Sequence, residues 1–454
     1  MPQRSPGQRT ALQYYAVLPV ERLKFSYDPH TAVAAFYSSV FDHVKCQYTE
    51  QVVFVVKLCI SAILDNSMKV LLIAPQPFFR IRGTPINVKN VASALIEGGH
   101  RVDLLCYPFG EDPLDLPDVR IIRGPGCPGI QDVKIGPSLA KIPLDILLFM
   151  KAWMLCRRAD YDVIHAVEES VFFGVWLSKW FRTQLIYDMD SIISDQLQYS
   201  GKVKSSRILG WITRLESWAI RNSTFVLTVC QSLSETTRRL CPETPIVQIE
   251  DAPVDEIYAP DPATVDRIRT EFHLYGHPVA VYTGNLEPYQ GVDLLIKSGP
   301  ILKDHLPSAR ILLVGGNPDQ ITSYKKQVAA SGCEEQFIFA GIRPIEEMAA
   351  FMETADILLS PRIEGTNTAL KVYSYMQSGK AILATDLPTH TQVMDRGCAA
   401  LVPPEPEAYM MELIRLLSDP QQAKTLGIAS AQRVEDQYSL KQFRRKVIEA
   451  YANL

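Results

Sequence analysis

Several protein classes are excluded by what this sequence does not contain. None of its nine cysteines form a C-x-x-C pair, and their number is odd. Reduced, inert thiols are therefore a better interpretation than a zinc site or a disulfide framework. The net charge of −4 lacks the basic excess that nucleic-acid binders show, so no nucleic-acid partner is expected. No histidine cluster suited to a cation is present, so we expect no metal.

The first 67 residues lack the strand–helix alternation that begins at Met68. Their apolar run, residues 51–64, includes Lys57 and is too short to span a bilayer. It also lies too far from the N-terminus to be a signal peptide. We expect residues 1–67 to be a poorly ordered N-terminal extension, arising from a start codon assigned too far upstream. A packing arm or a peripheral anchor is the alternative.

From Met68 onward, short apolar runs alternate with helical patterns, which predicts parallel strands with both faces covered by helices. The strands are expected at residues 69–75, 101–107, 119–123, 163–167, 185–190 and 225–229, and then at 246–249, 279–283, 311–315, 337–340, 357–360 and 381–385. Right-handed crossovers produce doubly wound sheets. The predicted fold class is α/β, with two Rossmann-like doubly wound domains facing across a cleft. The proline- and acid-rich residues 250–262 are the expected linker.

A polar loop in the second series organises that domain. It lies between the apolar strand at 357–360 and a helical pattern that runs from about residue 369 to 377. The loop contains Gly365, Thr366, Asn367 and Thr368. Because the first N–H groups of a helix lack partners and the dipole is positive there, such a loop is a ready anion site. Arg362 and Lys371 add positive charge at its two ends, and we interpret the site as the place of a diphosphate.

The same stretch, SPRxEGTNTxxKxYxYxxSGKxxxAT followed by THTQV, resembles the donor-site loop of the family-4 glycosyltransferases. It is most similar to bacterial members with GTNTP-x-K-x-Y in this loop, where this sequence has Ala369. The resemblance covers about residue 68 to the C-terminus. It implies a GT-B fold with an acceptor-side domain at 68–250 and a donor-nucleotide domain at 251–430. It also implies a last helix, within 431–454, that crosses back to the first domain.

The resemblance extends to YTGNLEPYQGVD at residues 282–293. Family members commonly carry arginine after the first glycine and lysine just before the second, and these cations clamp the donor diphosphate. Here Asn285 follows Gly284, and Gln290 stands at the second position. Neither residue brings charge, so we expect Arg362 and Lys371 to replace the missing cations.

Four further residues are assigned to the donor site by the resemblance. Gly83 lies in the loop after the first predicted strand, Gly315 ends another, and both would let the backbone approach the donor. Ser374 stands where many members have a glutamate that holds the ribose hydroxyls, and Glu364 is a substitute only if the loop is longer. Serine cannot accept from both hydroxyls as a carboxylate does, which leaves nucleotide selectivity open.

Polar residues also end two strands of the first predicted sheet. His165 and Glu168 lie at the carboxyl end of one strand, and Asp188 and Asp190 lie at the carboxyl end of another. Ligands of open α/β sheets bind at such strand ends. We predict these four as catalytic residues that contact the sugar or orient an acceptor hydroxyl, without assigning the action to one carboxylate. A structural histidine and helix-capping carboxylates are the alternatives.

The resemblance therefore implies a retaining glycosyltransferase that moves a sugar from a nucleoside-diphosphate sugar to a glycan, lipid-linked or small-molecule acceptor in glycan, lipid or polysaccharide biosynthesis. No cofactor beyond this co-substrate is expected. The expected location is the cytoplasm, with the inner face of the membrane as the alternative. Residues 136–158 predict a buried crossover helix. Weak peripheral membrane contact is the second interpretation, because this helix ends in basic residues.

Three other functions fit the sequence less well. A GT-B sugar-nucleotide epimerase would share the donor site but lack an acceptor groove. A catalytically weakened scaffold or binding protein would fit the missing arginine, lysine and glutamate. A nicotinamide oxidoreductase fits least, because no G-x-G-x-x-G follows the first strand.

Overall fold

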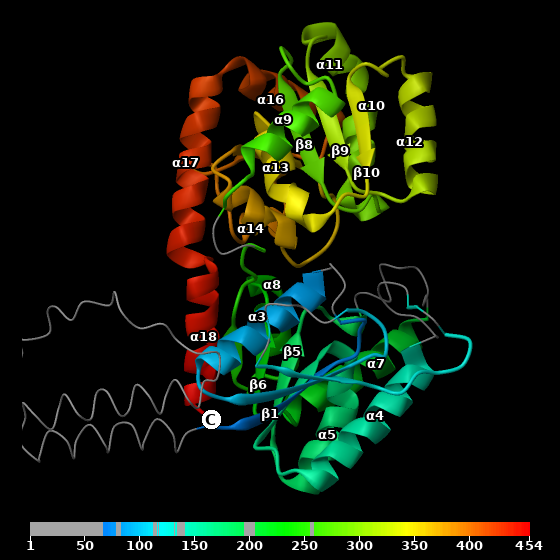
Figure 1. Cartoon of the computed structure of the whole chain (residues 1–454), viewed down its shortest axis with the longest axis vertical. Coiled ribbons are helices and arrows are strands. Elements are labelled where there is room, and N and C mark those ends of the chain that lie inside the picture. The colour runs from blue at the N-terminus through cyan, green and yellow to red at the C-terminus, as the bar shows by residue number, and fades with distance from the viewer. Residues whose placement is uncertain are drawn as a thin grey trace, which may run out of the picture. The chain divides into compact units, whose positions relative to one another are not determined.

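The computed structural model describes residues 67–78, 83–111, 116, 118–130, 132–133, 141–194, 205–254 and 258–454. These residues form two parallel α/β sheets, one of seven strands and one of six (Figure 1), which confirms the predicted fold class. The expected N-terminal extension lies outside the described residues, apart from Ser67. Residues Ser67–Leu454 form one compact unit, and the boundary expected at residue 250 stays a prediction.

The first sheet has the strand order β3-β2-β1-β4-β5-β6-β7. Its strands are β1 Lys69–Ala74, β2 Arg101–Cys106, β3 Arg120–Arg123, β4 Val163–Val167, β5 Gln184–Met189, β6 Phe225–Thr228 and β7 Ile246–Gln248. Its helices are α3 Gly83–Glu97, α4 Lys141–Arg158, η1 Glu168–Ser170, α5 Val171–Phe181, α7 Ser206–Arg221 and α8 Gln231–Leu240.

The second sheet has the order β10-β9-β8-β11-β12-β13. Its strands are β8 Val279–Thr283, β9 Arg310–Val314, β10 Phe337–Gly341, β11 Ile357–Ser360, β12 Ala381–Thr385 and β13 Ala400–Val402. The helices of this part are α9 Pro262–Glu271, η2 Pro288–Gln290, α10 Val292–Lys297, α11 Gly299–His305, α12 Pro318–Ala330, η3 Ile345–Glu347, α13 Met348–Glu353, α14 Leu370–Gln377, α15 Pro388–Thr391, α16 Pro406–Ser418, α17 Pro420–Gln437 and α18 Leu440–Ala452.

Twelve of these strands begin and end within two residues of the predicted ranges. The exception is β13, which is three residues long and which the sequence pattern did not predict. In both sheets the strand order reverses direction beside a central strand, between β1 and β4 and between β8 and β11. The carboxyl ends of strands at such switch points are where open α/β sheets bind ligands.

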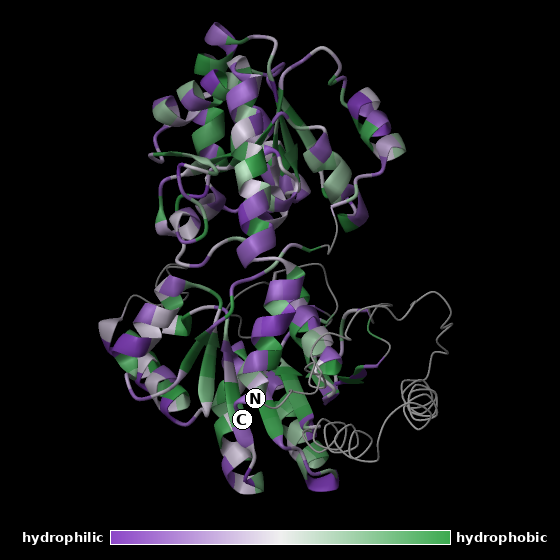
Figure 2. Ribbon diagram, turned by 90° about the vertical axis from the view of Figure 1, so that its left-hand side faces the viewer, coloured by the Kyte–Doolittle hydropathy of each residue, from purple (hydrophilic) through white to green (hydrophobic). Residues whose placement is uncertain are grey.

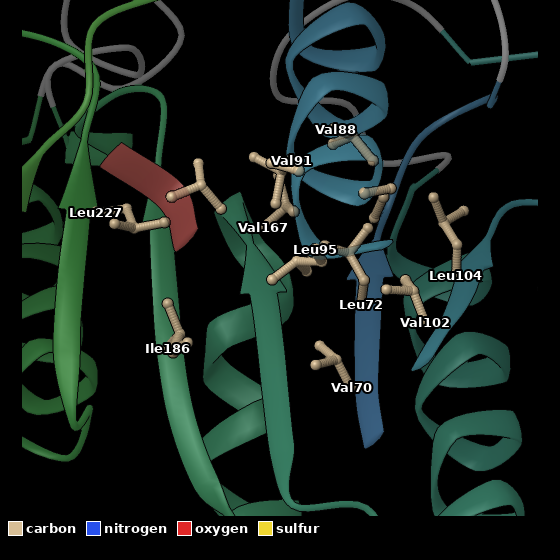
Figure 3. Close-up of a cluster of buried hydrophobic side chains, with 14 of the residues drawn as sticks. Val70, Leu72, Val88, Val91, Leu95, Val102, Leu104, Val167, Ile186 and Leu227 are labelled. Atoms are coloured by element: carbon tan, nitrogen blue, oxygen red, sulfur yellow. The ribbon is translucent and has the colours of Figure 1, made fainter. Parts of the chain in front are cut away.

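Helices cover both faces of the first sheet. Figure 3 shows Val88, Val91 and Leu95 of α3 packed over Val70 and Leu72 of β1, and these five side chains are at most 2 % exposed. The opposite face is covered by apolar residues of α4, α5 and α7. Because both faces are buried, the strands are nearly continuously apolar, as their green colour in Figure 2 shows.

Helix α18 belongs to the core of the first sheet, although it follows the second sheet in sequence. Its Phe443, Val447 and Tyr451 join the same cluster as α3 and β1, and α18 packs against α3. Lys446 of α18 also pairs with Glu250, at 2.5 Å. The end of the chain therefore stabilises the sheet with which the described chain begins.

Candidate active site

Three loops at the carboxyl ends of β8, β9 and β11 lie in backbone contact. The loop after β11 joins the loop after β8 through the Ile363 N–H, which donates to the Tyr289 carbonyl oxygen at 3.0 Å. Gly284 follows β8 with a φ of 138°, and Gly315 follows β9 with a φ of 121°. A Cβ on Gly315 would lie 2.0 Å from the Gly284 carbonyl oxygen. Glycine is required at both positions because side chains rarely adopt these φ values and no space exists for one at Gly315. Two of the predicted donor glycines thus lie side by side.

The loop after β11 is folded around Arg362, which is 7 % exposed. Its Nε donates to the Glu364 carbonyl oxygen at 2.7 Å, and its Nη2 donates to Asn367 Oδ1 at 3.0 Å. Gly365 has a φ of 115°, and a Cβ there would lie 2.1 Å from the Arg362 guanidinium. Arg362 therefore shapes the loop as well as bringing positive charge to it. The exposed Glu364 contributes its backbone.

Lys371 lies in the first turn of α14 and is partly buried. Its ammonium group lies 3.8 Å from the centroid of the Tyr282 ring and donates to Gln290 Oε1 at 3.2 Å. Burial, and after it the charge of Arg362, holds the pKa of Lys371 well below its usual 10.5. Among the described residues, neither cation forms an ion pair with a carboxylate. A bound anion would supply the missing negative charge.

The loop between β11 and α14 presents its N–H groups and not its carbonyl groups. The Thr366 carbonyl oxygen accepts from Gln392 Nε2 at 2.9 Å, and the Asn367 carbonyl oxygen accepts from Thr389 Oγ1 at 2.8 Å. Within the described part of the chain, the N–H groups of residues 365–368 donate to no acceptor. The buried Thr368 hydroxyl also has no hydrogen-bond partner there. Such unpaired donors beside a helix N-terminus suit a phosphate.

The other predicted donor residues are already engaged within the protein. Asn285 accepts from the Glu287 N–H at 3.2 Å, and Gln290 is 7 % exposed and positions Lys371. Ser374 Oγ accepts from the Val254 N–H at 3.3 Å. Gly83 is the first residue of α3, at a φ that is not positive, and a Cβ would meet nothing within 4 Å. The structure therefore gives no conformational reason for glycine at residue 83.

Two of the residues predicted as catalytic, His165 and Asp188, form a buried pair. His165 is 0 % exposed, and its Nε2 lies 3.0 Å from Asp188 Oδ2. Its Nδ1 lies 2.7 Å from the Tyr451 hydroxyl. Both ring nitrogens are thus occupied by protein groups, and Asp188 is only 3 % exposed. This arrangement suits the structural role that was the alternative for a lone histidine.

Glu168 and Asp190, the other two, are partly exposed. Burial raises the pKa of Glu168 to about 8, with the neighbouring Glu169 adding to the effect. Burial and Asp188 raise the pKa of Asp190 to about 7. Asn87 of α3 donates to Asp190 Oδ1 at 3.3 Å. Carboxyl groups with such pKa values can hold or release a proton at physiological pH, as acid–base groups do.

The backbone of Glu168 is in the left-handed region, with a φ of 48°. This conformation is costly for a residue with a side chain, and it recurs at functional sites where surrounding structure enforces it. It places Glu168 at the start of η1, directly after β4.

A polar network beside Glu168 was not predicted. Lys141 of α4 donates to Glu169 Oε1 at 2.6 Å, and the Tyr107 hydroxyl donates to Asp145 Oδ1 at 2.6 Å. The only signal in the sequence was the spacing of Lys141 and Asp145, which puts them on one face of a helix. No group of three or more residues in the described regions is arranged to hold a metal ion.

A family model described as "Glycosyltransferase Family 4" matches residues 81–250, and one described as "Glycosyl transferases group 1" matches residues 277–419. The first match covers most of the first sheet, and the second covers the second sheet. Together they span most of the chain. The chain belongs to the family-4 glycosyltransferases, a family of retaining hexosyltransferases.

Individual relatives are similar to this chain at low sequence identity or over a short part of its length. A phosphatidyl-myo-inositol mannosyltransferase of Mycobacterium leprae is 22 % identical over 77 % of this chain and 87 % of its own length. A GDP-mannose-dependent alpha-(1-6)-phosphatidylinositol monomannoside mannosyltransferase of Mycolicibacterium smegmatis is 32 % identical, but over 23 % of this chain and 27 % of its own. The structure of sucrose-phosphate synthase from Thermosynechococcus elongatus superposes with a TM-score of 0.70 at 18 % identity, over 85 % of this chain and 98 % of that one, which shows a shared fold.

Proposed function

We propose that this protein transfers a hexosyl group from a nucleoside-diphosphate sugar to an acceptor hydroxyl, with retention of configuration. One observation carries the proposal. Arg362 and Lys371 lie beside the N-terminus of α14 without a carboxylate partner among the described residues. The unpaired N–H groups of residues 365–368 lie between them in sequence. A diphosphate would satisfy the charge and the donors together.

In the proposed reaction, the bond between the anomeric carbon and the diphosphate breaks, and negative charge develops on the leaving diphosphate. Lys371, Arg362 and the N–H groups of residues 365–368 stabilise that charge. They stabilise the transition state more than the ground state, and the activation barrier therefore falls. The acceptor hydroxyl attacks on the face that the diphosphate leaves, and its proton passes to the departing diphosphate. Glu168 or Asp190 orients the hydroxyl through a hydrogen bond.

For the donor and acceptor, the relatives supply candidates. The name of one relative specifies GDP-mannose, and the names of both specify phosphatidylinositol-based acceptors. We therefore propose a lipid-linked or small-molecule hydroxyl acceptor and a cytoplasmic reaction at the inner face of a membrane. The described residues contain no helix long and apolar enough to cross a bilayer.

The test is nucleotide binding by isothermal titration calorimetry with GDP, UDP and ADP and with GDP-mannose, UDP-glucose and ADP-glucose. We expect one nucleotide to bind selectively and Lys371→Met to weaken its affinity by at least about tenfold, because a loss of 1.4 kcal/mol is a factor of ten. Lys326→Met on the exposed surface of α12 is the matched control. Equal affinity of the Lys371→Met and wild-type proteins would refute the proposed diphosphate site.

Turnover is measured separately, with the selected donor and candidate acceptors, and the anomeric configuration of the product is read by NMR. A weakened binding protein is the second candidate, because Asn285 and Gln290 stand where arginine and lysine are common and both bond within the protein. It predicts binding without turnover. Isomerisation of the donor in the absence of an acceptor would instead identify an epimerase.

A further inference from the structure

Exposed large apolar side chains are concentrated on three helices of the first sheet. Among the described residues, thirteen such side chains are exposed, and eight of them lie on α4, α5 and α7. They are Ile142, Ile146, Met150, Met154, Trp176, Trp180, Ile208 and Trp211. Single exposed apolar residues are normal, but a concentration on adjacent helices marks an interaction surface.

The exposed side of α4 is apolar along most of its length. Ile142, Ile146, Met150 and Met154 recur every four residues and are between 39 % and 56 % exposed. Residues spaced by four lie above one another on a helix. The opposite side of α4 packs in the core through other residues, including Leu144 and Leu148. The exposed stripe is therefore additional to the apolar face that folding requires.

Aromatic contacts join the three helices into one surface. Phe149 of α4 lies 6.4 Å from Trp180 of α5, and Trp176 of α5 lies 6.0 Å from Trp218 of α7, centroid to centroid. Trp211 is seven residues before Trp218 and therefore lies on nearly the same side of α7. All five tryptophans of the chain lie on these helices, namely Trp153, Trp176, Trp180, Trp211 and Trp218. We call this surface of α4, α5 and α7 the three-helix face.

The charges of these helices are almost all positive, although the chain as a whole carries −4. The basic residues are Lys141, Lys151, Arg157, Arg158, Lys179, Arg207, Arg214 and Arg221. The two acidic residues both bond inward: Asp145 accepts from the Tyr107 hydroxyl, and Glu216, which is 1 % exposed, accepts from the Ile193 N–H. A second copy of the same face would bring like charges together, whereas an anionic surface would be attracted.

We propose that the three-helix face docks onto an anionic lipid bilayer. Tryptophan prefers the headgroup level of a membrane, because its ring is apolar and its N–H is polar. The isoleucine and methionine stripe of α4 enters the boundary with the acyl chains. The basic residues other than Lys141, which is bonded to Glu169, contact anionic headgroups. Attachment of this kind is reversible and decreases with salt.

The three-helix face begins next to the carboxyl end of the first sheet. Lys141, the first residue of α4, bonds Glu169 at 2.6 Å, and Ile142 is the first exposed residue of the stripe. A bilayer along α4 therefore reaches the strand ends where Glu168 and Asp190 lie. The docking itself does not depend on the proposed transferase activity.

The experiment measures co-sedimentation of the full-length protein with phosphatidylcholine vesicles, with and without phosphatidylglycerol, in the absence of nucleotide. We expect binding to the anionic vesicles, a blue shift of tryptophan emission, and release at high salt. The variant Trp176→Gln/Trp180→Gln/Trp211→Gln should lose at least about tenfold in partitioning, equivalent to 1.4 kcal/mol. The control Met411→Gln/Ile428→Gln replaces two other exposed apolar residues, which lie on α16 and α17, and should bind like the wild type.

Three outcomes would overturn the proposal. The first is no binding to anionic vesicles, and the second is equal binding by the triple variant and the control. The third is a dimer in sedimentation velocity that the triple variant abolishes, because the three-helix face would then be an interface between copies. Nucleotide affinity of the triple variant is measured in parallel. Unchanged affinity separates a failure of docking from a failure of the proposed donor site.

Discussion

Nδ1 of His165 and the hydroxyl of Tyr451 lie 2.7 Å apart, although 286 positions separate these residues in the chain. Their rings are also stacked, with an interplanar angle of 12°. Asp188 occupies the other ring nitrogen. The last helix therefore completes a buried polar network with β4 and β5, and the first sheet and this helix depend on one another.

Removing the Tyr451 hydroxyl should destabilise the fold. In Tyr451→Phe, Nδ1 of the buried His165 loses its partner, which costs about 1–3 kcal/mol. Urea unfolding followed by circular dichroism measures the change. Tyr275→Phe is the control, because Tyr275 is 53 % exposed and surface changes usually stay within about 0.5 kcal/mol. Similar losses in both variants would show that the network contributes nothing special.

Diphosphate binding should weaken as the pH rises. The pKa of Lys371 is held well below 10.5 by burial and by Arg362, so the ammonium loses its charge at a lower pH than an ordinary lysine. A bound diphosphate favours the charged form and raises this pKa, so binding takes up a proton in the window between the two values. Calorimetry in buffers with different ionisation enthalpies measures the uptake. Lys371→Met should show none, and an uptake that persists in this variant would assign the proton elsewhere.

The free energy of unfolding should fall as the pH rises, because of the raised pKa of Glu168. Its pKa is about 8 in the folded state and 4.5 ordinarily, so between these values the folded state holds more protons than the unfolded state. The free energy of unfolding therefore falls with increasing pH, by about 1.4 kcal/mol per unit for one group. Glu168→Gln should flatten this dependence in denaturant titrations between these pH values. Glu235→Gln, on the exposed side of α8, should not.

The glycines between β8 and β9 should be intolerant of a side chain. In Gly315→Ala the new Cβ would lie 2.0 Å from the Gly284 carbonyl oxygen, at a φ of 121°. One loop must shift, so we expect a loss of stability above about 1 kcal/mol and weaker nucleotide binding. Gly210→Ala in α7, where a Cβ meets nothing within 4 Å, should stabilise by about 0.5–1 kcal/mol. Thermal unfolding compares the two.

The fold could be predicted from the sequence because its signals are local. Runs such as residues 279–283 and 381–385 are apolar throughout, and in a parallel sheet with both faces covered this pattern is required. The short β13 escaped because three residues carry too little pattern. The loop between β11 and α14 was also visible as a polar, glycine-containing segment between an apolar strand and a helix.

Tertiary structure decided the environment of each polar side chain, which sequence spacing does not encode. His165 and Glu168 are three residues apart, yet Tyr451 and Asp188 enclose the first, while the second remains partly exposed with a raised pKa. Lys371 has no carboxylate partner among the described residues. Tyr282 and Gln290, which come from another strand and loop, contact it instead. Five tryptophans dispersed over 66 residues meet on one surface only when α4, α5 and α7 pack side by side. Burial and charge pairing depend on distances in space, whereas the amino-acid sequence directly specifies only separations along the chain.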